Sequence, residues 1–428
     1  MTNRWVPDDG TALLMPADPE QLRFGGTEFL TAAFRGFGAL RSDDAVAAIT
    51  ECTECDGGST GRKLLLGVEY TSASNGLPTD LFVKFSRDFD NPRRDRGKTQ
   101  MDLEVSFARL CREQNVPVVV PRTLFAGYHV GSGTGLLVTE RIPYGIPPVE
   151  PHYDKCLDYQ MPEPLAHYRA LLASLARLAG ADKAGRLGAG VSRQFTFDPE
   201  RVTVGARASY THDELRDRVL AYDAFAAAHP ALIPSELRTA YFLDRMGKEV
   251  DVIFGHHDAV TTHLNGTVGH VALCHWNANV DNAWFWRNDA GVLDCGLLDW
   301  GCVSEMNVAM ALWGSLCSAE SDIWDLHLDA LLTHFADEYH RAGGPVLDLE
   351  ILRSQIILYA TVMGVTWLLD APTYLRAVVP ELADVTDRYD PRISGNEVAR
   401  TQLRMLTNFL GLWASHDVAA MLAELDSQ

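Results

Sequence analysis

Basic side chains are scarce in this chain of 428 residues. Lysine and arginine together number 37 against 57 aspartates and glutamates, which gives a formal net charge of −20. A nucleic-acid-binding face needs clustered positive charge to neutralise phosphates, so we expect no nucleic-acid partner. The acidic balance permits a neutral or cationic small-molecule partner, although solubility alone explains an acidic surface.

Long apolar runs, a leader sequence and paired cysteine motifs are also missing. No stretch of about 18 apolar residues is present, so we expect no membrane-spanning helix. The first ten residues lack the basic and then apolar pattern of a secretory signal. Eight cysteines are scattered, and the one C-x-x-C, at Cys52 and Cys55, has no second pair to complete a zinc site. Scattered cysteines predict a reducing, cytoplasmic setting.

The N-terminal third predicts a small antiparallel sheet with two helices. Residues 55–61, C-D-G-G-S-T-G, form a turn that needs the backbone freedom of glycine, and Asn75-Gly76 signals a hairpin. A Pro- and Gly-rich connector from Pro143 is where we place a hinge into a mainly helical part. The expected helices cover residues 19–40 and 99–114, and the expected strands cover residues 46–55, 63–71, 80–86, 116–125 and 136–142.

Lys84 lies inside the apolar run 81–85, where burial of its charge is costly unless the charge is paired. The predicted partner is Glu104, on the expected helix 99–114. A strand lysine paired with a helix glutamate is how protein-kinase-like phosphotransferases grip nucleotide phosphates. An edge lysine with its ammonium in water is the plainer interpretation, but the C-terminal pattern described below favours the nucleotide role.

Two other polar segments have plain interpretations. Residues 91–98, N-P-R-R-D-R-G-K, are predicted to be a solvated surface loop rather than a phosphate contact. The histidine-rich residues 255–263, with Asp258, lack the helical spacing of an H-E-x-x-H metal site. We therefore expect loop histidines at the mouth of a cleft and no metal there.

The most informative pattern lies between residues 271 and 301. His275, Asn277 and Asn282 follow an apolar run as H-x-N-x-x-x-x-N, and Asp299 ends a second apolar run as L-L-D-W-G. A polar loop, a hairpin and an aspartate after a hydrophobic strand are how protein-kinase-like phosphotransferases hold a metal–nucleotide complex.

In ordered succession from about residue 27 to residue 301, these features resemble the aminoglycoside-phosphotransferase and choline-kinase-like superfamily, and within it most nearly the ecdysteroid-kinase-like branch. The resemblance implies an α+β, bilobal protein-kinase-like fold. Its antiparallel-sheet N-lobe would cover residues 1–142 and its mainly helical C-lobe residues 143–428. It also implies an ATP- and Mg²⁺-dependent kinase that acts on a hydroxyl of a small molecule.

The resemblance assigns the nucleotide contacts to the N-lobe. Lys84 would hold the α and β phosphates, and Glu104 would hold Lys84. Backbone groups near Glu140 and Ile142 would bond the adenine edge. The glycine turn would contribute Gly57, Gly58, Ser59, Thr60 and Gly61.

The resemblance assigns the metal and the loop to the C-lobe. Asn282 and Asp299 would ligate Mg²⁺, a hard cation that prefers such oxygen ligands. His275 would support the loop through backbone contacts. Relatives often carry a further aspartate after Asp-Trp-Gly that braces the loop; here Glu305 and Asn307 are the polar candidates, and we expect the usual brace to be absent.

Asn277 stands where the superfamily carries an aspartate that accepts or orients the proton of the attacking hydroxyl. Asparagine is neutral and cannot be that base, although its oxygen can accept a hydrogen bond. Three interpretations stay open: Asn277 only orients the nucleophile; Asp281 or a histidine of residues 256–263 replaces the base; or the protein binds nucleotide as a pseudokinase or sensor without transfer. Nucleotidyl transfer onto protein is a further alternative.

The acceptor is expected to be a small, largely hydrophobic alcohol, because tryptophans crowd the region around the loop. Some of these rings belong to the core. Nothing in the sequence sets an oligomeric state. The tryptophans are Trp276, Trp284, Trp286, Trp300 and Trp313.

Overall fold

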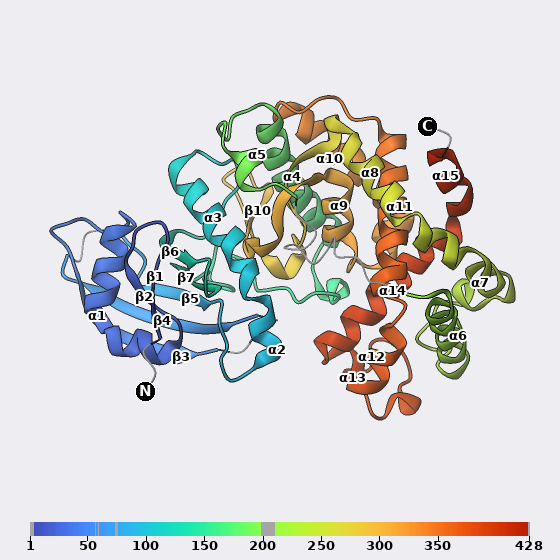
Figure 1. The fold of residues 1–428 in the computed structure, drawn as a ribbon, viewed down its shortest axis with the longest axis horizontal. Helices are drawn as coiled ribbons and strands as arrows, with labels where there is room; N and C mark the ends of the chain where they lie inside the picture. The colour runs from blue at the N-terminus through green and yellow to red at the C-terminus, as the bar shows by residue number, and fades with distance from the viewer. Residues whose placement is uncertain (1–3, 56, 59, 73–75, 198–209, 427–428) are drawn as a thin grey trace. The chain divides into compact units, whose positions relative to one another are not determined.

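The computed structural model describes residues 4–55, 57–58, 60–72, 76–197 and 210–426. They divide into two units. Figure 1 shows the chain as a ribbon with its helices and strands labelled. The fold is α+β, with a small antiparallel sheet in unit 1 and mostly helices in unit 2. Unit 1 comprises Met1–Val149, Leu187–Phe195 and Gly296–Val303, and unit 2 comprises Glu150–Arg186, Thr196–Cys295 and Ser304–Gln428.

Unit 1 is built on a five-stranded antiparallel sheet in the order β3-β4-β5-β7-β6. Side-chain alternation along β5 puts Val83 and Phe85 into an apolar core with Leu30 and Phe34 of α1, so Lys84 lies on the opposite face. The elements are β1 (Trp5–Pro7), β2 (Leu14–Pro16), α1 (Pro19–Gly36), β3 (Val46–Glu54), β4 (Arg62–Tyr70), β5 (Asp80–Phe85), α2 (Pro92–Asp95), α3 (Gln100–Glu113), β6 (Thr123–His129), β7 (Thr134–Glu140) and α5 (Val191–Gln194).

The glycine turn joins β3 to β4. Gly58 and Gly61 have φ angles of 63° and 56°, in the left-handed region that favours glycine. A Cβ atom at Gly61 would lie 1.7 Å from the carbonyl oxygen of Phe85. The turn can therefore approach the end of β5 only because glycine stands there.

Two predictions for unit 1 are wrong in detail. The strand expected over residues 116–125 begins only at Thr123 and continues to His129. Pro117 and Pro121 cannot donate to a ladder, and Val119 makes only an isolated bridge, to Gly296. Residues 91–98, expected to form a loop, are mostly helical, in α2 and a 3₁₀ turn over Arg96–Thr99.

Unit 2 is mainly helical, with two two-stranded sheets, β8 with β11 and β9 with β10. The last residues of β10 and the first of β11 belong to unit 1. The elements are α4 (Pro164–Lys183), α6 (His212–Ala228), α7 (Ala240–Gly255), α8 (His257–Gly266), β8 (Val271–His275), β9 (Ala283–Arg287), β10 (Leu293–Leu297), β11 (Val303–Asn307), α9 (Val308–Leu316), α10 (Ser321–Arg341), α11 (Leu349–Trp367), α12 (Ala371–Val378), α13 (Pro391–Ser394), α14 (Glu397–Ser415) and α15 (Val418–Leu425).

Helix α11 is the apolar centre of unit 2. By length and composition it could cross a membrane, which differs from the expectation above, but 72% of its apolar window is buried. A helix that is apolar on all sides and mostly buried is a core helix.

The histidine-rich segment is helical, so the predicted loop is wrong. His256 is the cap residue after α7, and His257 and His263 belong to α8. Val260 and Leu264 of α8 are both buried, and their spacing of four continues the helical pattern through the histidines. Within the ranges that the structure describes, no group of three metal-ligating side chains occurs.

Candidate functional site

Lys84 lies between two carboxylates. Its Nζ atom is 2.7 Å from Oε2 of Glu104 on α3, and it also donates to Oδ1 of Asp299. Lys84 and Glu104 are 9% and 5% exposed, so the predicted pair is a buried one. Burial opposes the charge of Lys84, but Asp299 and Glu104 outweigh burial and raise its pKa. Burial, followed by the charge of Asp299, holds the pKa of Glu104 above its ordinary value although Lys84 opposes this.

Asp299 reaches Lys84 because residues 296–303 are held against α3. The ring of Trp300 stacks on Phe107 of α3 with centroids 3.8 Å apart, and Leu297 N–H donates to Val119 O at 2.9 Å. Asp299 itself has a φ of 63°, a left-handed conformation that costs energy for a residue other than glycine. Its side chain is 40% exposed, so it is partly accessible to solvent.

Two further cations support the glycine turn. Lys63 Nζ donates to the carbonyl oxygens of Gly57 and Thr60 at 2.7 and 2.8 Å. Arg94, in the segment predicted to be a solvated loop, donates to Gly61 O at 2.7 Å and to Gly57 O at 3.2 Å. These contacts fix the turn at its described residues, whereas the predicted site residue Ser59 lies outside the described part of the chain.

Lys63 faces Lys84 directly across the β4–β5 ladder. Burial, and then the charges of Lys84 and Arg94, lower the pKa of Lys63 to about 8. Like charges opposite one another on a sheet are unfavourable. Glu104 and Asp299 reduce this repulsion, and a bound anion beneath the turn would reduce it further.

At the end of β7, most backbone N–H groups already have protein partners, so few could donate to the adenine ring of a nucleotide. Glu140 N–H donates to Arg122 O at 2.8 Å, and Arg141 N–H donates to Asp80 O at 3.0 Å. The side chain of Glu140 accepts from Arg122 N–H. Ile142 N–H has no protein partner among the described residues, so of the three N–H groups at residues 140–142 it is the one that remains as a possible donor to adenine.

The loop after β8 is held by amide side chains. Asn279 Nδ2 donates to Asn277 Oδ1 at 3.0 Å, and Asn282 Nδ2 donates to Asn277 O at 2.8 Å. Ser318 Oγ donates to Asn279 Oδ1 at 2.8 Å. The Asn282 amide group is thereby oriented, with Oδ1 as the atom that can ligate a metal.

The other predicted loop residues face different partners. His275 is fully buried in β8. Asp281 Oδ2 lies 3.8 Å from Lys155 Nζ, and burial raises the pKa of Asp281 while Lys155 opposes the rise. Asn307 caps α9 and donates to Leu264 O, so it does not brace the loop. Asn279 and Ser318 provide the brace instead.

The five tryptophans have different surroundings within their own units. Trp300 belongs to unit 1, and Trp284 and Trp313 are buried. Trp276 Nε1 donates to the hydroxyl of Tyr359 on α11 at 2.9 Å. None of the five lines the large cavity of unit 2, which Trp324 does line.

Sequence reasoning missed four residues: Lys63, Arg94, Asn279 and Ser318. A charged residue at the start of an apolar strand was a usable signal for Lys63. Arg94 follows a proline and an asparagine cap, which predicts a helix start rather than a loop. Ser318 is far from the loop in sequence, so no local pattern could connect it to Asn279.

The chain matches no protein-family model and no curated protein. Similar solved structures include a choline kinase from Cryptosporidium parvum Iowa II, with 11% identity, coverage of 88% of this chain and 92% of that one, and a TM-score of 0.45. A microcompartment-associated aminopropanol kinase is 12% identical, with coverage of 87% and 94% and a TM-score of 0.41. The GDP complex of aminoglycoside 2'-phosphotransferase-IIIa is 15% identical, with coverage of 85% and 95% and a TM-score of 0.39.

At these identities and TM-scores, the similarities assign neither an activity nor a substrate to the chain. The case for a function rests on its own residues, and the ecdysteroid-kinase-like branch stays a prediction.

Replacing Lys84 by methionine should destabilise unit 1 by about 3–5 kcal/mol, because Glu104 would be left as a buried, unpaired carboxylate. The pKa of Glu104 is already raised, and losing Lys84 removes the charge that lowers it. The folded variant then binds a proton more readily than the unfolded chain, so its stability should rise as pH falls from 8 to 5.

Thermal unfolding at both pH values checks this expectation. The double variant Lys84→Met, Glu104→Gln removes the buried charge and should recover much of the lost stability without the pH dependence. A double variant as unstable as the single one would contradict the ion-pair account.

Proposed function

We propose that the protein is an ATP- and Mg²⁺-dependent phosphotransferase that phosphorylates a hydroxyl of a small molecule. The observation that carries the proposal is the ammonium of Lys84, which contacts both Glu104 and Asp299 on the sheet face below the glycine turn. Phosphoryl transfer needs little covalent chemistry from the protein, because positioning and charge stabilisation supply most of the catalysis.

In this proposal, Lys84 binds the α and β phosphates and Glu104 keeps its ammonium in place. Lys63 adds a second cation beneath the turn, and its low pKa makes its charge responsive to a bound phosphate. Ile142 N–H is the candidate donor to the base.

The oxygen atoms available suit Mg²⁺. Each unit offers one proposed ligand: Asp299 of unit 1 through its carboxylate, and Asn282 of unit 2 through Oδ1. Carboxylate and amide oxygens are preferred by this ion. When bound, the metal would neutralise charge on the phosphates. The position of Asp299 against Lys84 supports this role, because one carboxylate can serve the ammonium and a metal through different oxygens.

For the acceptor proton, we propose that Asn277 orients the hydroxyl without acting as a base. Its Oδ1 atom already accepts from Asn279, which fixes the side chain. In a loose transition state the hydroxyl proton is lost late, so a strong base contributes little. Nucleotide binding without transfer is the second candidate, favoured by the neutral residue at position 277.

Lys84→Ala and Asp299→Asn should each reduce ADP formation by at least about a hundredfold, since each removes a charge directed at the phosphates or metal. Lys84→Ala should also weaken binding of ATP, measured by calorimetry. Lys248→Ala, which removes an exposed lysine of unit 2, is the control and should change neither quantity.

Unchanged nucleotide affinity in Lys84→Ala would show that the site is assigned wrongly. ATP binding without ADP release across a broad alcohol panel would favour the non-catalytic candidate. Release of pyrophosphate would indicate nucleotidyl transfer.

Asn277→Asp should keep the loop intact, because an aspartate oxygen can accept the same hydrogen bond from Asn279. If Asn277 only positions the hydroxyl, the turnover number should rise by no more than about tenfold, with ATP affinity unchanged. A rise of about a thousandfold, the range that a general base supplies, would overturn the positioning role.

A further inference from the structure

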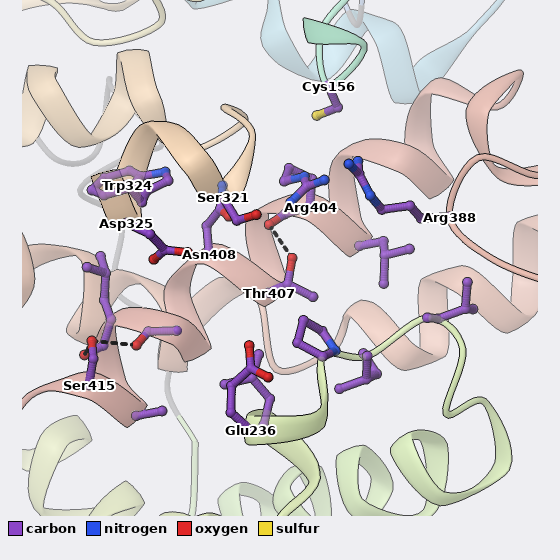
Figure 2. Close-up of a pocket in the computed structure, with 18 of the residues that line it drawn as sticks. Cys156, Glu236, Ser321, Trp324, Asp325, Arg388, Arg404, Thr407, Asn408 and Ser415 are labelled. Carbon is purple, nitrogen blue, oxygen red and sulfur yellow. Dashed lines mark hydrogen bonds between the residues drawn. The ribbon is translucent and has the colours of Figure 1, made fainter. Parts of the chain in front are cut away.

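A cavity of about 880 Å³ lies within unit 2, apart from the residues discussed so far (Figure 2). It is enclosed by α14, the start of α10, the 3₁₀ turn Ser235–Arg238 and the segment that contains Cys156. Its volume is in the range of small-molecule sites, about 300–1,000 Å³. Its lining includes Cys156, Trp324, Arg388, Arg400, Arg404 and Asn408.

One wall of this cavity carries an excess of positive charge. Arg388 Nη1 and Arg404 Nη2 each lie 2.9 Å from the carboxylate of Glu320, which therefore serves two guanidinium groups. Figure 2 shows the head groups of Arg388 and Arg404 pointing toward one another. Arg400 donates only to the backbone oxygens of Lys155 and Ser394, and no described carboxylate lies within ion-pair distance of it.

The buried carboxylate of Asp158 also interacts with Arg404, so two carboxylates, Glu320 and Asp158, face the three guanidinium groups. One positive charge, that of Arg400, is left for an added anion. Guanidinium groups match carboxylates in shape and can donate two parallel hydrogen bonds to them. Arg404 is 8% exposed, so a ligand acid there would be largely shielded from water. The acidic lining residues Glu236 and Asp325 are exposed, so water screens their charges.

Two segments connect the cavity wall to the loop of residues 277–282. Asn408, on the wall, donates to Cys317 O and Ala319 O, and the Ser318 between them holds Asn279. Cys156 adjoins Lys155, the partner of Asp281. The residues that hold the loop carrying Asn277 are therefore in direct contact with the cavity wall.

We infer that this cavity binds the acceptor and that the acceptor is a hydroxy acid, whose acid group lies on Arg388, Arg400 and Arg404. The inference rests on the proposed phosphotransferase function. It replaces the expectation of a largely hydrophobic alcohol, because the predicted tryptophans line no part of this cavity and charged groups dominate one wall.

The test is calorimetric binding of 3-hydroxybutanoate, mandelate and 4-(hydroxymethyl)benzoate to the full chain, each compared with its neutral methyl ester. The acids should bind and the esters should bind at least about tenfold more weakly. Arg400→Gln should weaken binding of the acids about tenfold and leave the esters unchanged. Arg353→Gln is the matched control, because Arg353 lines the same cavity but its charge is paired with Asp329.

Equal binding of acids and esters, or equal losses in Arg353→Gln and Arg400→Gln, would overturn the inference, as would binding of 2-aminoethanol in preference to the acids. If Arg400→Gln fails to fold, Arg388→Gln replaces it, since Glu320 keeps Arg404 as its partner there.

Measuring ATP affinity in Lys84→Ala distinguishes a failure of this inference from a failure of the proposed function. Loss of ATP affinity in Lys84→Ala with indifferent binding of acids and esters would overturn the hydroxy-acid inference alone. Selective binding of the acids without their phosphorylation, together with unchanged ATP affinity in Lys84→Ala, would overturn the phosphotransferase function and the acceptor role of the cavity.

Discussion

A buried ammonium group that needs two carboxylates organises unit 1. Lys84 would be too costly to bury alone, and Glu104 from α3 together with Asp299 from residues 296–303 make its burial possible. The stacking of Trp300 on Phe107 places the neighbouring Asp299 beside Lys84. The ion pair therefore also holds residues 296–303 against the sheet. The same two carboxylates also reduce the repulsion between Lys84 and a second lysine, Lys63, on the same face of the sheet. In our proposal, Lys84 and Lys63 bind the phosphates of a nucleotide below the glycine turn.

In unit 2, neutral side chains rather than charged ones hold the loop of residues 277–282. Its loop is ordered by amides and a hydroxyl, from Asn277 through Asn279 to Ser318, and holds no ionised side chain in that network. Such a loop can orient a hydroxyl while adding no charge of its own. In unit 2, one wall of the cavity carries three arginines, Arg388, Arg400 and Arg404. In our proposal, charge therefore selects the acceptor and neutral hydrogen bonds position it.

Local patterns were enough to predict β3, β4 and β5, and the cost of burying a charge pointed to the pair of Lys84 with Glu104. Contacts set by register or by long-range packing could not be predicted in the same way. Lys63 meets Lys84 only because of the β4–β5 register, and Asp299 meets Lys84 only because Trp300 packs on α3. The cavity combines residues from 156 to 416, and no single stretch of sequence signals it. Strand β6 begins later than predicted because Pro117 and Pro121 precede it. The histidine-rich segment is helical because Val260 and Leu264, four residues apart, are both buried.

Calorimetric titration of the intact protein with adenosine, AMP, ADP and ATP, with and without Mg²⁺, tests the central claim most directly. If the Lys84 cluster is a phosphate site, affinity should rise at least about tenfold from AMP to ADP, because the second phosphate adds charge-assisted hydrogen bonds. Mg²⁺ should strengthen ATP binding further. Equal affinity for adenosine and ATP, unaffected by Mg²⁺, would contradict the account.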